Sequence, residues 1–83
     1  MAEKETLHLV IASVGETRFD GRAASATIPT TAGEITVLPH HEAIVSTLKP
    51  GTITVRETSG EQKTFPIDGG VLEVSGNRAV VLL

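Results

Sequence analysis

Apolar residues recur at every second position along most of the chain, the spacing that places one side of an extended strand against a protein core. In residues 7–12, Leu7, Leu9 and Ile11 share one side, while the other side is partly apolar, which predicts a strand in the middle of a sheet. The same alternation predicts further strands around these groups: Ala24, Ala26 and Ile28; Ile35 and Val37; Ile53 and Val55; Phe65 and Ile67; Leu72 and Val74; Ala79 and Val81.

Residues that favour turns separate these segments. Ser75-Gly76-Asn77-Arg78 has the composition of a tight hairpin, which predicts that strand 71–75 pairs with strand 78–82. Lys49-Pro50-Gly51 predicts a type II turn with a positive φ at its glycine. Further turns are expected at Gly15, Asp20-Gly21 and Ser59-Gly60.

The chain is long enough for one domain, since it has 83 residues. Val, Ile and Thr supply 26 of them, an enrichment typical of strands, and the single helical candidate is one turn at His40 to Ser46. We therefore predict an all-β fold over residues 6–83, an antiparallel β-sandwich of about ten strands, after a disordered tail at residues 1–5. Alternation and layer packing predict this inward-facing set: Leu9, Ile11, Ile28, Val37, Val55, Leu72 and Val81.

Charge and composition exclude several classes of function. The net charge is −3 and the chain has no Trp or Tyr, so neither phosphate attraction nor base stacking supports nucleic-acid binding. It has no Cys for a disulfide or a thiolate metal site. No apolar run approaches the roughly 18 to 20 residues of a membrane span, and the acidic start is unlike a secretory signal. This pattern is typical of a cytoplasmic protein without direct membrane insertion.

Candidate chemistry is sparse. Residues 40–42, His-His-Glu, are adjacent, so an extended chain points them to opposite sides and they do not close on one metal ion. Ser46, His41 and either Asp20 or Asp68 lack the spacing of a hydrolytic triad. Gly69-Gly70 precedes a strand, where it indicates a backbone bend instead of a phosphate loop. We expect no catalytic residue, metal or cofactor, and a function that resides in a surface. A stand-alone binding module and a minimal enzyme are the competing classes.

Five segments, in order, resemble the epsilon subunit of rotary ATP synthases, which is called delta in mitochondria. Residues 32–41, Ala-Gly-Glu-Ile-Thr-Val-Leu-Pro-His-His, resemble that family's G-E-hydrophobic-x-hydrophobic-L-P-x-H segment. Leu7–Ser13 is similar to the family's opening strand, and Phe19–Gly21 to its aromatic-x-Gly turn. Leu48–Gly51 is similar to its K-P-G turn, and Gly69–Val74 with Asn77 and Val80 to its closing hairpin. The resemblance extends over residues 6–83.

The resemblance implies a ten-stranded sandwich in the central stalk of a proton-translocating ATP synthase. It implies a non-catalytic rotor subunit that joins gamma to the membrane c-ring and helps to couple proton flow to ATP synthesis, peripheral to the cytoplasmic side of the energy-coupling membrane. Ala32, Gly33 and Glu34 then face the polar loops of the c-ring, and His41 and Ser46 face gamma. The alternative remains a stand-alone β-sandwich that binds another protein.

The chain also departs from the family pattern. His40 stands where the family usually has Gly, and Ala43 where it usually has Pro. Epsilon subunits usually continue into a two-helix hairpin that can inhibit hydrolysis and in some bacteria binds ATP, and these 83 residues contain no counterpart to it. Neither function is implied for them, and we expect them neither to bind nor to hydrolyse ATP.

Overall fold

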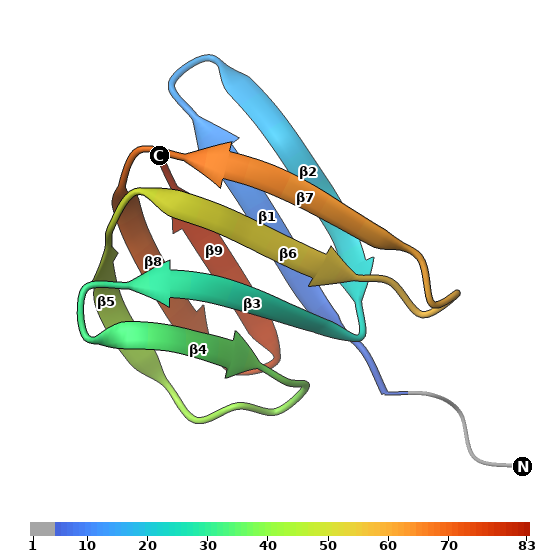
Figure 1. Cartoon of the computed structure of the whole chain (residues 1–83). Helices are drawn as coiled ribbons and strands as arrows, with labels where there is room; N and C mark the ends of the chain where they lie inside the picture. Colours follow the sequence, from blue (N-terminus) through green and yellow to red (C-terminus); the bar gives the residue numbers. More distant parts are fainter. Residues whose placement is uncertain (1–4) are drawn as a thin grey trace, which may run out of the picture.

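The computed structural model describes residues 5–83, in which nine β-strands and no helix occur (Figure 1). The predicted tail at residues 1–5 lies outside the described residues except for Glu5. The strands are β1 (Leu7–Ser13), β2 (Glu16–Ala23), β3 (Ser25–Thr30), β4 (Gly33–Val37), β5 (Ile44–Leu48), β6 (Gly51–Arg56), β7 (Gln62–Ile67), β8 (Gly70–Ser75) and β9 (Arg78–Leu82).

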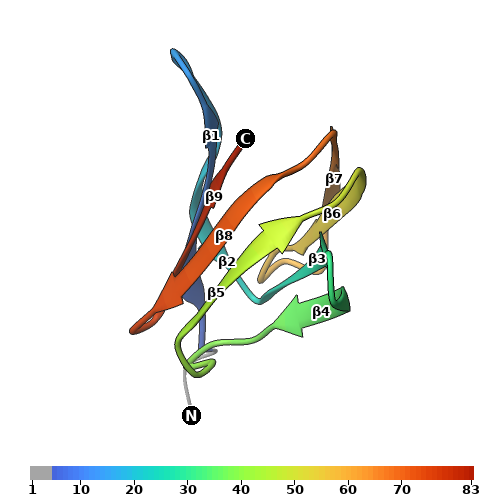
Figure 2. The same ribbon diagram turned by 90° about the vertical axis from the view of Figure 1, so that its left-hand side faces the viewer.

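The strands form two layers that face each other across the core (Figure 2). Hydrogen-bonded neighbours follow the path β2-β1-β9-β8-β5-β3-β6-β7, and β4 pairs with the other side of β3. The sheet turns between β5 and β3, where the only paired residues are Leu48 and Thr30. We call β2-β1-β9-β8-β5 the first layer and β4-β3-β6-β7 the second. The predicted all-β sandwich is confirmed, with nine strands in place of the expected ten.

The pairing of strands follows the prediction at the closing hairpin and differs at β1. Val71 lies opposite Leu82 and Ser75 opposite Arg78, so the predicted hairpin is confirmed. The antiparallel prediction is wrong for β1 and β9, which run parallel in register from His8–Arg78 to Ala12–Leu82. Two strands about 70 positions apart are not linked by a local turn, so turn residues could not reveal their relative direction.

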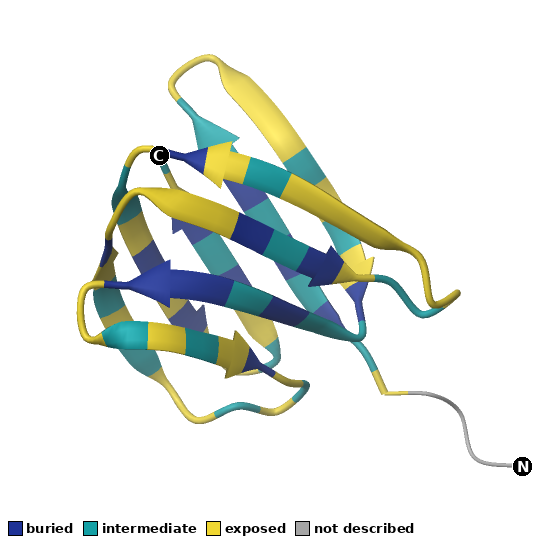
Figure 3. Cartoon of the chain, viewed as in Figure 1, coloured by how far each residue is buried: buried dark blue, intermediate teal, exposed yellow. Residues whose placement is uncertain are grey.

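The core contains all seven residues predicted to face inward, each with 0% exposure (Figure 3). Between β2 and β3 the alternation changes phase: Ala23 and Ala26 are buried, whereas Ala24 is half-buried. The chain passes between the layers here, and the Ala24 amide donates to the Arg56 carbonyl oxygen at 2.8 Å. The predicted grouping of Ala24 with Ala26 and Ile28 on one side of a strand therefore holds only for Ala26 and Ile28, because the crossing between the layers resets the alternation.

Three local predictions are corrected. Residues 40–46 form no helical turn: residues 44–48 are β5, whose pairing with β8 satisfies the backbone along the strand. Asp20 and Gly21 lie within β2, paired with β1. Gly51 lacks a positive φ and starts β6; a Cβ there would lie 3.1 Å from Pro29 side-chain atoms, so the glycine provides space. By contrast, Gly15 and Gly60 have the positive φ expected in turns.

One side chain, that of Asn77, ties three segments together at one end of the sandwich. Its Oδ1 accepts a hydrogen bond from the His40 amide at 2.9 Å, and its Nδ2 donates to the Thr6 carbonyl oxygen at 2.5 Å. His40 has φ 63°, the left-handed conformation that glycine adopts more easily. Asn77 thus holds the β4–β5 loop in a conformation that this histidine does not favour by itself.

Asn77→Ala is expected to lower the free energy of unfolding by about 1 to 2 kcal/mol, because it removes both hydrogen bonds and leaves two backbone groups to find other partners. Urea denaturation followed by circular dichroism measures the change. Ser75→Ala, at an exposed position of the same hairpin, is the matched control and is expected to change stability by less than about 0.5 kcal/mol. Equal stabilities of the two variants would contradict this role for Asn77.

Candidate functional site

His41 and Ser46, both considered for catalysis, each donate a hydrogen bond to the backbone carbonyl oxygen of the next residue. The His41 Nδ1–H donates to the Glu42 carbonyl oxygen at 2.7 Å, and the Ser46 hydroxyl donates to the Thr47 carbonyl oxygen at 3.2 Å. Across residues 5–83, no group of three His, Asp or Glu side chains could hold a metal ion. The arrangement therefore gives no support to the hydrolytic triad or the metal site considered from the sequence.

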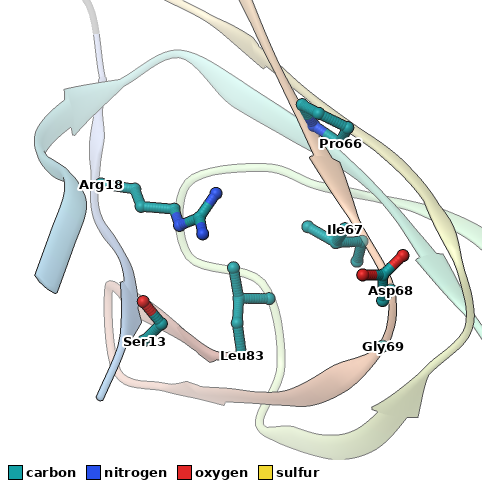
Figure 4. Close-up of a pocket in the computed structure, with 7 residues that line it drawn as sticks. All are labelled: Ser13, Arg18, Pro66, Ile67, Asp68, Gly69 and Leu83. Atoms are coloured by element: carbon teal, nitrogen blue, oxygen red, sulfur yellow. The ribbon is translucent and has the colours of Figure 1, made fainter. Parts of the chain in front are cut away.

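A hollow of about 440 Å³ lies at one end of the sandwich (Figure 4). Ser13 and Arg18 line one side and Pro66 to Gly69 the other, with Leu83 between them. The described lining residues include no histidine that could activate the Ser13 hydroxyl. Gly69 and Gly70 have φ of +145° and +141°, so the backbone bend expected at this glycine pair is confirmed.

The outer side of the first layer, turned away from the core, carries several exposed or half-buried apolar side chains. Strand register places Val10 beside Val80, and Leu82 between Ala12 and Val71. Val45 lies on the same side of β5, and the exposed Glu73 of β8 lies between it and Val80. Val45, Val71 and Leu82 are 72%, 41% and 58% exposed. We call this surface the apolar face; it consists of Val10, Ala12, Val45, Val71, Val80 and Leu82.

The outer side of the second layer is polar instead. Thr36, Thr27, Thr54 and Thr64 lie opposite one another across its four strands. The hydroxyls of Thr27 and Thr36 are 3.2 Å apart and share a hydrogen bond. One side of the sandwich thus suits water, while the other leaves adjacent apolar side chains uncovered, the kind of patch that marks a docking surface. The apolar face is the candidate functional site.

Sequence reasoning did not single out this face, although a signal was present. A strand that buries one side alternates strictly, whereas residues 79–83, Ala-Val-Val-Leu-Leu, are apolar on both sides. Residues 71 and 72 of β8 are likewise both apolar. Such runs indicate that both sides of a strand are covered, and in the described chain nothing covers the outer side. The uncovered side became evident only once the layers were known.

The residues expected to face a membrane ring occupy the β3–β4 turn. Glu34 is exposed at the start of β4, and Gly33 has φ +127°. Buried Thr30 shapes the turn: its hydroxyl donates to the Gly33 carbonyl oxygen at 2.5 Å and accepts from the Ala32 amide at 3.2 Å. The structure therefore brings Ala32, Gly33 and Glu34 together on one firmly held, exposed turn.

The two residues expected to face gamma lie on different segments. His41 is in the loop that precedes β5, where its amide donates to the Leu38 carbonyl oxygen at 3.1 Å. Ser46 is in the middle of β5, half-buried, on the side opposite Val45. Ser46 therefore points away from the apolar face. His41, Ser46 and the apolar face do not form one compact patch.

Comparisons with known proteins agree with this architecture. Residues 6–83 match the family model described as ATP synthase, Delta/Epsilon chain, beta-sandwich domain. An ATP synthase epsilon chain of Bordetella parapertussis is 40% identical over 78 residues, which cover 93% of this chain and 55% of that protein. This chain thus spans about half the length of such relatives.

Two solved structures have the same fold. A chain of the Euglena gracilis mitochondrial ATP synthase, solved as OSCP/F1/c-ring, superposes with a TM-score of 0.88 at 28% identity, covering 93% of this chain and 49% of that one. A chain of the Tetrahymena thermophila central stalk and c-ring assembly has a TM-score of 0.75 at 19% identity, covering 98% and 65%, and supports the fold alone. The family match over nearly the whole chain carries the assignment: this chain belongs to the ATP synthase delta/epsilon family, as its β-sandwich domain.

Proposed function

We propose that this chain is the sandwich domain of a non-catalytic rotor subunit in the central stalk of a proton-translocating ATP synthase. It joins the gamma subunit to the c-ring and so helps to couple proton flow to ATP synthesis. Family membership and the relative solved within an ATP synthase assembly support this role. None of the described residues forms a helix long and apolar enough to cross a membrane. We place the domain peripherally, on the cytoplasmic side.

The observation that carries the proposal is the one-sided apolar face. Its four strands, β1, β9, β8 and β5, are neighbours in the first layer, so the apolar side chains extend over about 14 Å. Covering them with a partner removes apolar area from water, the main favourable contribution to most protein associations. We assign this face to gamma. His41, in the loop before β5, and Ser46, on the other side of β5, remain the two further positions expected to face gamma.

Association with gamma is tested by mixing the purified 83-residue chain with the gamma subunit of the same organism. Calorimetric titration is expected to give a one-to-one complex, and size-exclusion chromatography to recover it. If gamma and the chain stay separate at micromolar concentrations, the proposed function is wrong, and a stand-alone protein-binding module becomes the better interpretation.

The ring-facing assignment leads to a separate prediction for Glu34. This residue is exposed in the β3–β4 turn, and the loop that contains His41 follows the other end of β4. Glu34→Lys is expected to change the affinity for gamma by less than about threefold, since exposed charge contacts contribute about 1 kcal/mol or less. It is expected to reduce ATP-driven proton pumping in reconstituted complex, and less so at high salt, because it reverses the charge presented to the polar loops of the ring.

Glu61→Lys is the matched control for Glu34→Lys. Glu61 is also exposed, but it lies in the β6–β7 loop, away from the β3–β4 turn. Proton pumping is measured by quenching of a pH-sensitive dye in vesicles that contain the complex. Equal pumping by both variants, or loss of gamma binding by Glu34→Lys, would contradict the division into two surfaces.

A further inference from the structure

Two arginines border the apolar face at one end. Arg22 of β2 lies opposite His8 of β1, and Arg78 of β9 lies on the other side of His8. All three side chains belong to the outer side of the first layer, because the register puts them in phase with Val10 and Val80, two residues further along β1 and β9. We call Arg22 and Arg78 the arginine pair.

The nearby carboxylates leave the arginine pair free of ion pairs. Asp20 is the acid nearest to Arg22 along β2, and its Oδ1 accepts a hydrogen bond from His8 Nε2 at 2.6 Å. Glu73 lines the same shallow hollow as Arg78, of about 250 Å³, together with Ser75 and Val80. Within residues 5–83, neither arginine is within ion-pair distance of a carboxylate.

This arrangement has no evident benefit for the fold. His8 lies between the two arginines, and within residues 5–83 neither arginine stabilises the fold through an ion pair. Arg22 and Arg78 are both exposed residues. Each presents a planar set of donors suited to binding a carboxylate through two hydrogen bonds. A partner that covers Val10 and Val80 also comes within reach of both arginines.

We infer that the gamma segment that covers the apolar face carries carboxylates at the end that meets Arg22 and Arg78. This inference rests on the proposed function and adds the chemistry of the partner: apolar side chains toward Leu82 and Val71, and acidic side chains toward the arginine pair. The charges fix the direction in which the segment lies, because reversing it would place carboxylates on the apolar residues and leave both arginines uncovered.

The test compares gamma binding by the unsubstituted chain and by the double variant Arg22→Gln, Arg78→Gln. At about 50 mM salt the variant is expected to bind about tenfold more weakly, and at about 500 mM salt less than threefold, since screening removes the contribution of exposed charges. Its melting temperature is expected to stay within a few degrees of that of the unsubstituted chain, because both arginines are exposed and make no ion pair within residues 5–83. The matched control is Lys49→Gln, Arg56→Gln, which removes two exposed charges away from this face and is expected to leave affinity unchanged.

The outcomes separate this inference from the proposed function. If both double variants bind gamma as the unsubstituted chain does, the inference is wrong and the proposed function stands. If the unsubstituted chain itself does not bind gamma, both are wrong. A second arm replaces gamma by vesicles that contain phosphatidylserine. Vesicle binding that depends on the arginine pair, combined with unaltered gamma binding, would assign the pair to a lipid surface and overturn the inference.

Discussion

Leu82→Glu is expected to weaken association with gamma by about 100-fold or more. Leu82 lies between Ala12 and Val71, in the row of the apolar face farthest from the arginine pair. An apolar side chain that a partner buries completely contributes about 2 kcal/mol or more, and a carboxylate there would also lose its water on binding. A 100-fold change corresponds to about 2.8 kcal/mol. Calorimetric titration with gamma measures it.

The fold of this variant should persist, which allows the result to be assigned to binding. Leu82 is 58% exposed, so a glutamate at this position remains in water in the free chain. Thr64→Glu is the matched control, on the outer side of the second layer. Both variants should melt within a few degrees of the unsubstituted chain. Undiminished binding by Leu82→Glu would show that gamma does not dock on this face.

Gly70→Ala is expected to lower the free energy of unfolding by about 3 kcal/mol or more, a large part of the about 4 to 12 kcal/mol typical of a domain of this length. A Cβ at this position would lie 2.5 Å from the Leu82 carbonyl oxygen, and φ is +141°, which side chains other than glycine rarely permit. The Leu82 carbonyl oxygen cannot move aside freely, because Leu82 belongs to β9, which is paired with β1 on one side and with β8, the strand of Gly70, on the other.

Gly15→Ala separates the clash from the backbone conformation. Gly15 also has a positive φ, +76°, but a Cβ there would meet no atom within 4 Å. This variant should cost about 1 kcal/mol, the usual penalty for a left-handed residue. Both changes are measured by urea denaturation. If Gly70→Ala costs no more than Gly15→Ala, the close approach of β8 to β9 does not constrain this bend.

The local pattern predicted the parts of the fold that depend on neighbours in sequence. Period-two alternation identified which side of each strand faces the core, and residues such as Leu9 and Leu72 are fully buried as expected. The hairpin at Gly76 and Asn77 was predictable because a two-residue loop dictates the register of its strands. The family resemblance, carried by short motifs in order, indicated the sandwich, and the family model match confirms it.

The tertiary structure alone decided the features that join distant segments. The parallel pairing of β1 with β9 brings His8 beside Arg78, and the Asn77 side chain reaches the backbone of Thr6 and His40. No local signal encodes such contacts, because they arise when the layers assemble.

The candidate site was hidden in the sequence for the same reason. Val10 and Val80 are apolar residues on the second side of core strands, and their pattern is the same whether that side is covered or exposed. Which side remains open depends on where the second layer packs, and that packing covers Leu9 and Val81 while leaving the valines on the surface. Alternation along the chain thus determined the two faces of each strand, and only the closure of one layer on the other decided which apolar face was left for a partner.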